Sequence, residues 1–280
     1  MRKYSLLRER VMASNLVPPQ HISEPMGATD EQLLRVHSHD YLENVKNGTL
    51  NKSDIRRMGF PWSLGLVERS RRSVGGTIAA CQNALIDGMA VNLAGGTHHA
   101  GRDHGEGFCV FNDVVVAARA MQSEAGVERV LIVDCDVHQG NGTASLCADD
   151  PTIFTFSIHG EKNFPFRKMP SDLDIALADG TADADYLEAL ELGLLQSLSL
   201  AHADLVIYLS GADAYVGDRL GRLSLSKQGL LVRDQMVYGL CQSMGLPIAT
   251  VMAGGYAPQI EDIVDIHFQT VQLAVALTPS

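Results

Sequence analysis

The sequence has few cysteines, and their arrangement argues against two common uses of this residue. Five cysteines occur in 280 residues, and no two of them form a CxxC pair. Disulfide frameworks usually contain an even number of cysteines in a short chain, and structural zinc sites often contain CxxC pairs. We therefore expect neither arrangement, and we expect a reducing, cytoplasmic environment.

Long apolar runs and an excess of basic residues are also missing. No apolar stretch approaches the roughly 20 residues that a membrane-spanning helix needs, and the charged N-terminal segment lacks the apolar core of a signal peptide. Lysine and arginine number 22 against 33 aspartates and glutamates, which gives a net charge of −11. Because general nucleic-acid binders need a basic surface, we expect no membrane span and no nucleic-acid partner.

Short apolar segments alternate with amphipathic segments along most of the chain. We predict strands at residues 89–94, 129–134, 152–157, 205–210 and 248–253. We predict helices at residues 4–15, 30–36, 67–86, 112–123, 183–199, 226–244 and 260–277, and a long surface segment at residues 48–66. Another helix is expected to start at residues 37–42, where we interpret His37 and His39 as a polar helix entry rather than as metal ligands. Such an alternation forms a mainly parallel sheet that is covered on both faces. The composition does not change along the chain, so we expect one three-layer α/β/α domain over residues 1–280.

Residues 130–142, which read VLIVDCDVHQGNG, are the most informative stretch. A predicted buried strand runs directly into Asp134, Asp136 and His138, which are spaced by two. In extended backbone such side chains share one face, and a carboxylate with an imidazole begins a zinc site. The alternative is a strand that ends in a polar turn, with the acids capping the next helix. Cys135 would point to the opposite face.

Polar residues follow all five predicted strands, at the ends where functional sites of parallel sheets form. They are the pair His98 and His99, then Asp136 with His138, His159, Asp213 and Tyr256. Each has an ordinary alternative, such as a pair of loop histidines, a helix cap at Asp213 or an aromatic covering at Tyr256. Together they supply three metal ligands with an open fourth position, an acid–base histidine pair and a hydroxyl donor.

The ordered motifs HH, GFC, DxDxHxGNG, GADxxxGDRLG and GGY resemble those of the zinc-dependent histone deacetylase family on the arginase-like fold. The segments GDRLGRLSLS and QGNG are most similar to the class IV branch and its bacterial homologues. The resemblance runs from about Lys3 to the end of the chain. Relatives usually have a further strand and a His/Pro-containing loop before the segment matched by residues 3–10. Either that N-terminal edge strand is missing here, or this chain starts later than its relatives do.

The resemblance implies a catalytic metal site. Asp136, His138 and Asp213 would hold Zn²⁺, although these ligands also suit Fe²⁺. His98 and His99 would face the zinc-bound water, with His99 acting as general base and then as general acid.

Further residues would support this pair of histidines. Asp134 would stand behind His98 and Asn141 behind His99. Because a neutral amide stabilises an imidazolium less than a carboxylate does, we predict that His99 is the less basic of the two. Tyr256 would donate a hydrogen bond to the substrate carbonyl.

A substrate tunnel and a second metal site are also implied by the resemblance. Gly107, Phe108 and Phe164 match the walls of a tunnel that holds an acyl-lysine stem, and Leu220 matches its edge. A structural monovalent cation, K⁺ or Na⁺, would be bound by oxygen atoms of Asp134, Asp136, His138, Ser157 and Ile158.

The predicted function is a zinc-dependent amidohydrolase that removes acetyl or longer acyl groups from the lysine ε-amine of proteins or peptides. One alternative is a hydrolase of small acylated amines such as acetylated polyamines, and the rim acids Asp103 and Glu106 could serve either cationic substrate. Another is a module that binds acyl-lysine without cleaving it, against which Tyr256 and the complete ligand set count. A di-manganese hydrolase of arginase type ranks low, since Asn141 and Ala212 stand where further carboxylates would be needed. The sequence leaves the oligomeric state open.

Overall fold

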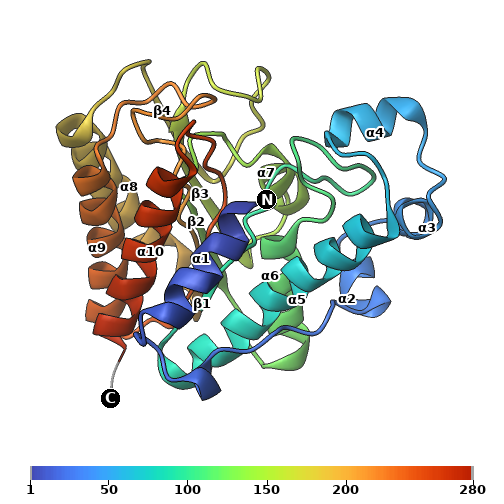
Figure 1. Cartoon of the computed structure of the whole chain (residues 1–280), viewed down its shortest axis with the longest axis horizontal. Helices are drawn as coiled ribbons and strands as arrows, with labels where there is room; N and C mark the ends of the chain where they lie inside the picture. Colours follow the sequence, from blue (N-terminus) through green and yellow to red (C-terminus); the bar gives the residue numbers. More distant parts are fainter. Residues whose placement is uncertain (1, 279–280) are drawn as a thin grey trace.

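The computed structural model describes residues 2–278 of the chain. Six parallel strands form one sheet at the centre of the molecule (Figure 1). The strands are β1 (Met89–Asn92), β2 (Val130–Asp134), β3 (Ile153–Gly160), β4 (Leu173–Leu177), β5 (Leu205–Leu209) and β6 (Ile248–Val251). Their order is β1-β6-β5-β2-β3-β4, so β1 and β4 form the edges. Because every pair is parallel, the carboxyl ends of all six strands lie at the same end of the sheet.

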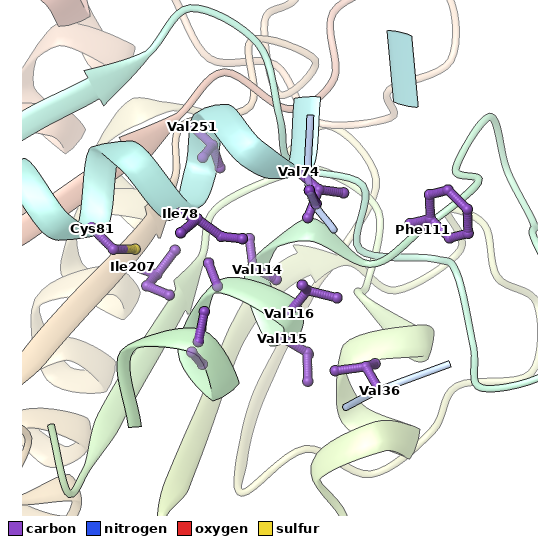
Figure 2. Close-up of a cluster of buried hydrophobic side chains, with 14 of the residues drawn as sticks. Val36, Val74, Ile78, Cys81, Phe111, Val114, Val115, Val116, Ile207 and Val251 are labelled. Carbon is purple, nitrogen blue, oxygen red and sulfur yellow. The ribbon is translucent and has the colours of Figure 1, made fainter. Parts of the chain in front are cut away.

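Helices cover both faces of this sheet. One face carries α5 (Leu64–Asp87) and α6 (Asp113–Glu124), and the other carries α8 (Asp183–Ala201), α9 (Lys227–Ser243) and α10 (Ile260–Leu277). Side chains of β2 alternate between the two layers, with Ile132 in the α5–α6 core and Leu131 in the α8–α9 core. Figure 2 shows the first core, where Ile78 of α5 lies near Val114 of α6 and Ile207 of β5. The predicted three-layer arrangement is confirmed.

Further helices surround these layers. The first is α1 (Arg2–Ala13), which packs Leu7 and Val11 against Phe268 of α10 and is followed by a 3₁₀ helix at Pro19–His21. The others are α2 (Asp30–Leu34), α3 (His39–Asn47), α4 (Lys52–Met58) and α7 (Asn141–Cys147). None of the helices within residues 2–278 combines the length and the apolar composition that a bilayer crossing requires.

Three elements differ from the sequence-based expectation. The segment at residues 48–66 is not a continuous surface loop, because it contains α4, which Asn51 caps and the left-handed Gly59 ends. Residues 141–147 form α7, a helix that is absent from the predicted elements. The sixth strand, β4, escaped prediction because it is an edge strand whose side chains alternate between half-buried and exposed.

His37 lies between α2 and α3 and connects these small helices to the loop at residues 101–112. It is 1% exposed; its Nδ1 lies 2.9 Å from the carbonyl oxygen of Gly101, and its Nε2 accepts a hydrogen bond from the Asn112 amide at 3.0 Å. These two contacts require a neutral ring, with the proton on Nδ1. Burial lowers the pKa of His37 from its ordinary value of 6.5 to about 4. His37 is therefore a structural residue, in agreement with the expectation that the histidines at this helix entry are not metal ligands.

We predict that His37 makes folding stability depend on pH. Between pH 6.5 and 4 the unfolded chain binds a proton at His37 that the folded chain does not bind, so the free energy of unfolding falls as the pH falls. The loss reaches about 2 kcal/mol at pH 5. Urea unfolding of wild type and His37→Gln at pH 7 and pH 5 measures it, and the variant should lose that much less between the two pH values. Equal losses, or the same effect in the exposed neighbour His39→Gln, would contradict this assignment.

Candidate metal centre and active site

Three buried side chains come together at the carboxyl end of the sheet. Asp136 and His138 lie in the loop after β2, and Asp213 lies in the loop after β5; their ligand atoms are all within 4.8 Å of one another. His138 Nδ1 is 2.9 Å from Asp136 Oδ1 and 3.3 Å from Asp213 Oδ2. Ligands of one tetrahedral zinc ion, each at about 2.0–2.2 Å, are separated by about 3.3 Å. The spacing and the donor types therefore fit a zinc ion.

Surrounding contacts leave room for that ion. The Gly254 amide donates to Asp136 Oδ2 at 2.8 Å and the His138 amide donates to Asp136 Oδ1 at 2.9 Å, whereas Asp213 is held through one oxygen, Oδ1, which accepts from the Val137 amide at 3.0 Å. Asp213 Oδ2 is buried and has no hydrogen-bond partner within residues 2–278. A Cβ atom at position 254 would overlap this oxygen, so the position needs glycine. A buried acceptor without a partner is costly unless a cation fills the space beside it.

The electrostatics of the cluster favour a positive charge. Although burial disfavours the charged imidazole, the carboxylates of Asp136 and Asp213 raise the pKa of His138 to about 10. Burial and the neighbouring Asp136 raise the pKa of Asp213 to about 6. A bound metal cation supplies the positive charge that these two carboxylates otherwise take from a proton.

Asp134 does not join this cluster, although its spacing in the sequence placed it on the same face. The strand ends at Asp134, and the chain bends over the next residues. Asp134 Oδ2 lies 2.6 Å from His98 Nδ1, and Asp134 Oδ1 accepts a hydrogen bond from the Asp136 amide. Cys135 is fully buried in the α8–α9 core, as expected.

His98 and His99 lie side by side with different partners. Their ring centroids are 4.1 Å apart, and His99 Nδ1 lies 2.7 Å from Asn141 Oδ1. Despite burial, the charges of Asp134 and Asp136 raise the pKa of His98 to about 9. Burial and the neighbouring His98 hold the pKa of His99 well below its ordinary value. His99 is thus the less basic of the pair, as predicted, and it is able to accept a proton at neutral pH.

The loop that carries these histidines is anchored by one buried carboxylate. Asp113, at the start of α6, accepts hydrogen bonds from the Gly96 and Thr97 amides at 3.0 and 2.6 Å. The left-handed backbone of Gly96 brings this loop against Ala253, in the turn that follows β6. The histidine pair and the residues after β6 are therefore placed by direct packing between two loops.

Tyr256 and two phenylalanines line the approach to the cluster. The rings of Phe108 and Tyr256 are 6.0 Å apart, and Phe164 contacts His99 edge-on at 5.0 Å. Phe108 is 44% exposed, so it lies at the entrance. Gly107 passes so close to His99 that a Cβ atom would lie 2.6 Å from its ring. Burial raises the pKa of the Tyr256 phenol, which keeps its proton.

The remaining sequence-predicted residues lie at the margins of the site. Leu220 is 46% exposed, and its carbonyl oxygen accepts a hydrogen bond from Asn163 Nδ2 at 2.7 Å. Ser157 is the β3 partner of Asp134 in the strand register, and Ile158 follows it. His159 is buried with Nδ1 3.0 Å from Ser157 Oγ, and it is not one of the three clustered ligands.

Two positively charged side chains near the site, those of Lys3 and Arg233, were not predicted from the sequence. The ammonium of Lys3 donates to the Ala253 carbonyl at 2.8 Å and lies 5.4 Å from the Tyr256 ring. Arg233 of α9 is fully buried and donates to the Gly211 carbonyl at 2.5 Å, between β5 and Asp213. Lys3 gives no local signal, because its partner is 250 residues away. Arg233 interrupts the apolar face of a predicted helix, and that irregularity is a usable signal.

A wide groove of about 1610 Å³ lies on the side of β1. It is lined by α1, α5 and the edge strand, and its lining also includes Phe108 and Tyr256. Asp136, His138 and Asp213 are not among its lining residues. The groove therefore adjoins the approach to the cluster without containing it.

The chain is similar to several known proteins. The family model of the histone deacetylase domain matches residues 1–271. An uncharacterized protein of Picosynechococcus sp. is 45% identical over 267 residues, which cover 95% of this chain and 89% of that protein. Histone deacetylase 2 of Arabidopsis thaliana is 30% identical over 264 residues, with 91% and 68% covered. The acetoin utilization protein AcuC of Staphylococcus aureus is 27% identical over 275 residues, with 90% and 70% covered.

Solved structures show the same fold. A histone deacetylase homologue from Aquifex aeolicus has a TM-score of 0.84 and 23% identity over 98% of this chain and 78% of that chain. A structure of a histone deacetylase homologue complexed with SAHA gives the same values.

Proposed function

Because the chain belongs to the histone deacetylase domain family, which supports a deacetylase or amidohydrolase activity, we propose that it is a zinc-dependent lysine deacylase. It would remove acetyl or longer acyl groups from the lysine ε-amine of proteins or peptides. What supports this proposal is the cluster of Asp136, His138 and Asp213 next to a pair of histidines, of which His98 has a raised pKa and His99 a lowered pKa. Among family branches, we propose class IV and its bacterial homologues, and we propose a cytoplasmic location.

In this proposal Asp136, His138 and Asp213 hold the zinc ion, which when bound activates water and polarises the amide carbonyl. His99, unprotonated at Nε2, accepts a proton from the attacking water molecule. The same nitrogen then returns this proton to the leaving amine as the carbon–nitrogen bond breaks, so the products are a free amine and a carboxylic acid, which releases its own proton to become a carboxylate. Tyr256 donates its hydroxyl hydrogen to the substrate oxygen as negative charge develops there.

His98 and the aromatic residues have supporting roles in the proposed reaction. With Asp134 behind it, His98 stays protonated and contributes positive charge near the reacting carbonyl. Phe108 and Phe164 form apolar walls for a lysine stem, with Gly107 and Leu220 beside them. The complex of a histone deacetylase homologue with SAHA supports an acyl-amide occupant of such a tunnel. A structural K⁺ or Na⁺ beside Asp134, Ser157 and Ile158 belongs to the same proposal.

Deacylation of a panel of lysine peptides, from acetyl to myristoyl, tests this function, with acetylspermidine assayed in parallel. Turnover of a peptide with one zinc ion per chain supports the proposal, and the preferred acyl group defines the substrate. Turnover of acetylspermidine alone would favour the small-molecule hydrolase. Zinc binding without any amide cleavage would favour a module that recognises acyl-lysine.

Removal of one metal ligand gives a separate prediction. Asp213→Asn is expected to weaken zinc binding by more than about 100-fold, because the substitution replaces an anionic ligand with a neutral amide. Competition with a chromophoric chelator measures the affinity. Asp149→Asn, an exposed change of the same kind, is the control and should bind zinc as wild type does. An unchanged affinity in Asp213→Asn would place the metal elsewhere.

A further inference from the structure

Asn141 contacts His99 through a side chain that has two possible orientations. An amide turned one way presents its oxygen to His99 Nδ1, and turned the other way it presents its NH₂ group. In the structure the oxygen faces the ring at 2.7 Å. A carboxylate at this position would present an acceptor in either orientation, whereas an asparagine needs something to hold it.

Glu106 occupies the other side of this amide. Asn141 Nδ2 donates to Glu106 Oε2 at 2.8 Å. Because a carboxylate only accepts hydrogen bonds, this contact requires the NH₂ group to face Glu106 and the oxygen to face His99. The accepting oxygen in turn requires the proton of His99 to be on Nδ1, which leaves Nε2 free.

Glu106 itself is held in place. Its Oε1 accepts a hydrogen bond from Arg57 Nε at 3.0 Å. Its backbone amide and carbonyl both pair with Cys109, at 3.0 and 2.8 Å, and the next amide, of Gly107, donates to the Arg57 carbonyl at the end of α4. Both carboxylate oxygens are thus engaged within the protein, which differs from the expectation that Glu106 is a free rim acid for cationic substrates.

We propose that Glu106 is a positioning residue that fixes the Asn141 amide and, through it, the tautomer of His99. This inference rests on the proposed function, in which His99 accepts a proton at Nε2. Without Glu106 the amide can turn, and its NH₂ group then favours the other tautomer, with the proton on Nε2. Such a ring cannot act as the base, although the substrate still binds.

A double-mutant cycle with Asn141→Asp tests the proposal. We expect Glu106→Ala to lower kcat about fivefold to tenfold, the effect of one lost hydrogen bond, with KM changed less than twofold. Glu106→Gln should recover most of kcat, because its amide oxygen can accept from Asn141. In the Asn141→Asp background, adding Glu106→Ala should cause no further loss. Glu161→Ala, an exposed acid-to-alanine change on a nearby loop, should leave kcat unchanged.

A spectroscopic measurement makes the test independent of turnover. In ¹⁵N-histidine NMR of the zinc-loaded protein, His99 should carry its proton on Nδ1 in wild type and partly on Nε2 in Glu106→Ala. An unchanged tautomer, equal losses of kcat in both backgrounds, or a loss confined to KM would overturn the positioning role. If wild type cleaved no amide, the proposed function would fail, while the tautomer measurement would still decide whether Glu106 orients Asn141.

Discussion

Replacing Tyr256 by phenylalanine is expected to lower kcat/KM for an acyl-lysine peptide by about 10²–10³-fold, the usual cost of one donor to a developing oxyanion. The substitution removes a single hydroxyl group. The ring keeps its packing against Phe108, at 6.0 Å, and its place beside the Lys3 ammonium, at 5.4 Å. Tyr256 is not a metal ligand, so zinc should remain bound. Steady-state kinetics and metal analysis on the same samples measure both quantities.

Tyr4 provides a matched control for this experiment. Its hydroxyl contacts the Ala253 carbonyl at 3.3 Å, in the same turn, but belongs to α1. Tyr4→Phe should change kcat/KM by less than about fivefold, the effect of one weak neutral hydrogen bond. A comparable loss in both variants would indicate that the turn, rather than the Tyr256 hydroxyl, limits the reaction. A Tyr256→Phe enzyme with wild-type kinetics would remove Tyr256 from the mechanism.

The central strands could be predicted because their burial is visible in the sequence. All five residues of β2 and of β5 are buried, and both segments read as continuous apolar runs that end at a polar residue. Edge strand β4 reads LDIAL, with one charged residue and incomplete burial, so no comparable pattern marks it. Helices α4 and α7, each of seven residues, are too short for a helical period to emerge.

The ligand cluster could be predicted for a topological reason. Parallel strands bring the residues after β2 and β5 to one place, so Asp136 and Asp213 meet despite the distance between them in the sequence. The two-residue period of a strand gave the wrong position for Asp134. The backbone bends after that residue, and its carboxylate lies against His98 instead of facing the cluster. Contacts such as that of Glu106 with Asn141 depend on how one loop packs against another. No periodic pattern in the sequence predicts the packing of two loops.

Arg233 is the clearest case of a residue whose role only the packing shows. It is fully buried between α9 and the loops of the metal cluster. Its Nη1 donates to the Gly211 carbonyl at 2.5 Å and lies 3.5 Å from the Cys135 carbonyl, and these carbonyls belong to the loops that carry Asp213 and Asp136. Its Nε donates to Asp234 at 2.9 Å. The guanidinium therefore joins both ligand loops to α9.

We predict that Arg233→Met lowers the free energy of unfolding by about 3–5 kcal/mol, because it leaves the buried Asp234 carboxylate without its counter-charge. Methionine keeps much of the side-chain volume, so a cavity contributes little to the loss. Hydrogen bonds from Tyr208 and Thr270, both at 2.5 Å, still reach Asp234 but carry no positive charge. Urea unfolding at pH 7 measures the change.

Two further variants separate charge burial from loss of a contact. Arg233→Met combined with Asp234→Asn should be less destabilised than Arg233→Met alone, because the second change removes the uncompensated charge while keeping a hydrogen-bonding side chain. Arg222→Met breaks an exposed pair with Asp179 and should cost less than about 1 kcal/mol. If Arg233→Met cost no more than Arg222→Met, the guanidinium would not hold the ligand loops. If the double variant were the less stable, the missing donors to Gly211 and Cys135, rather than the unpaired carboxylate, would account for most of the loss.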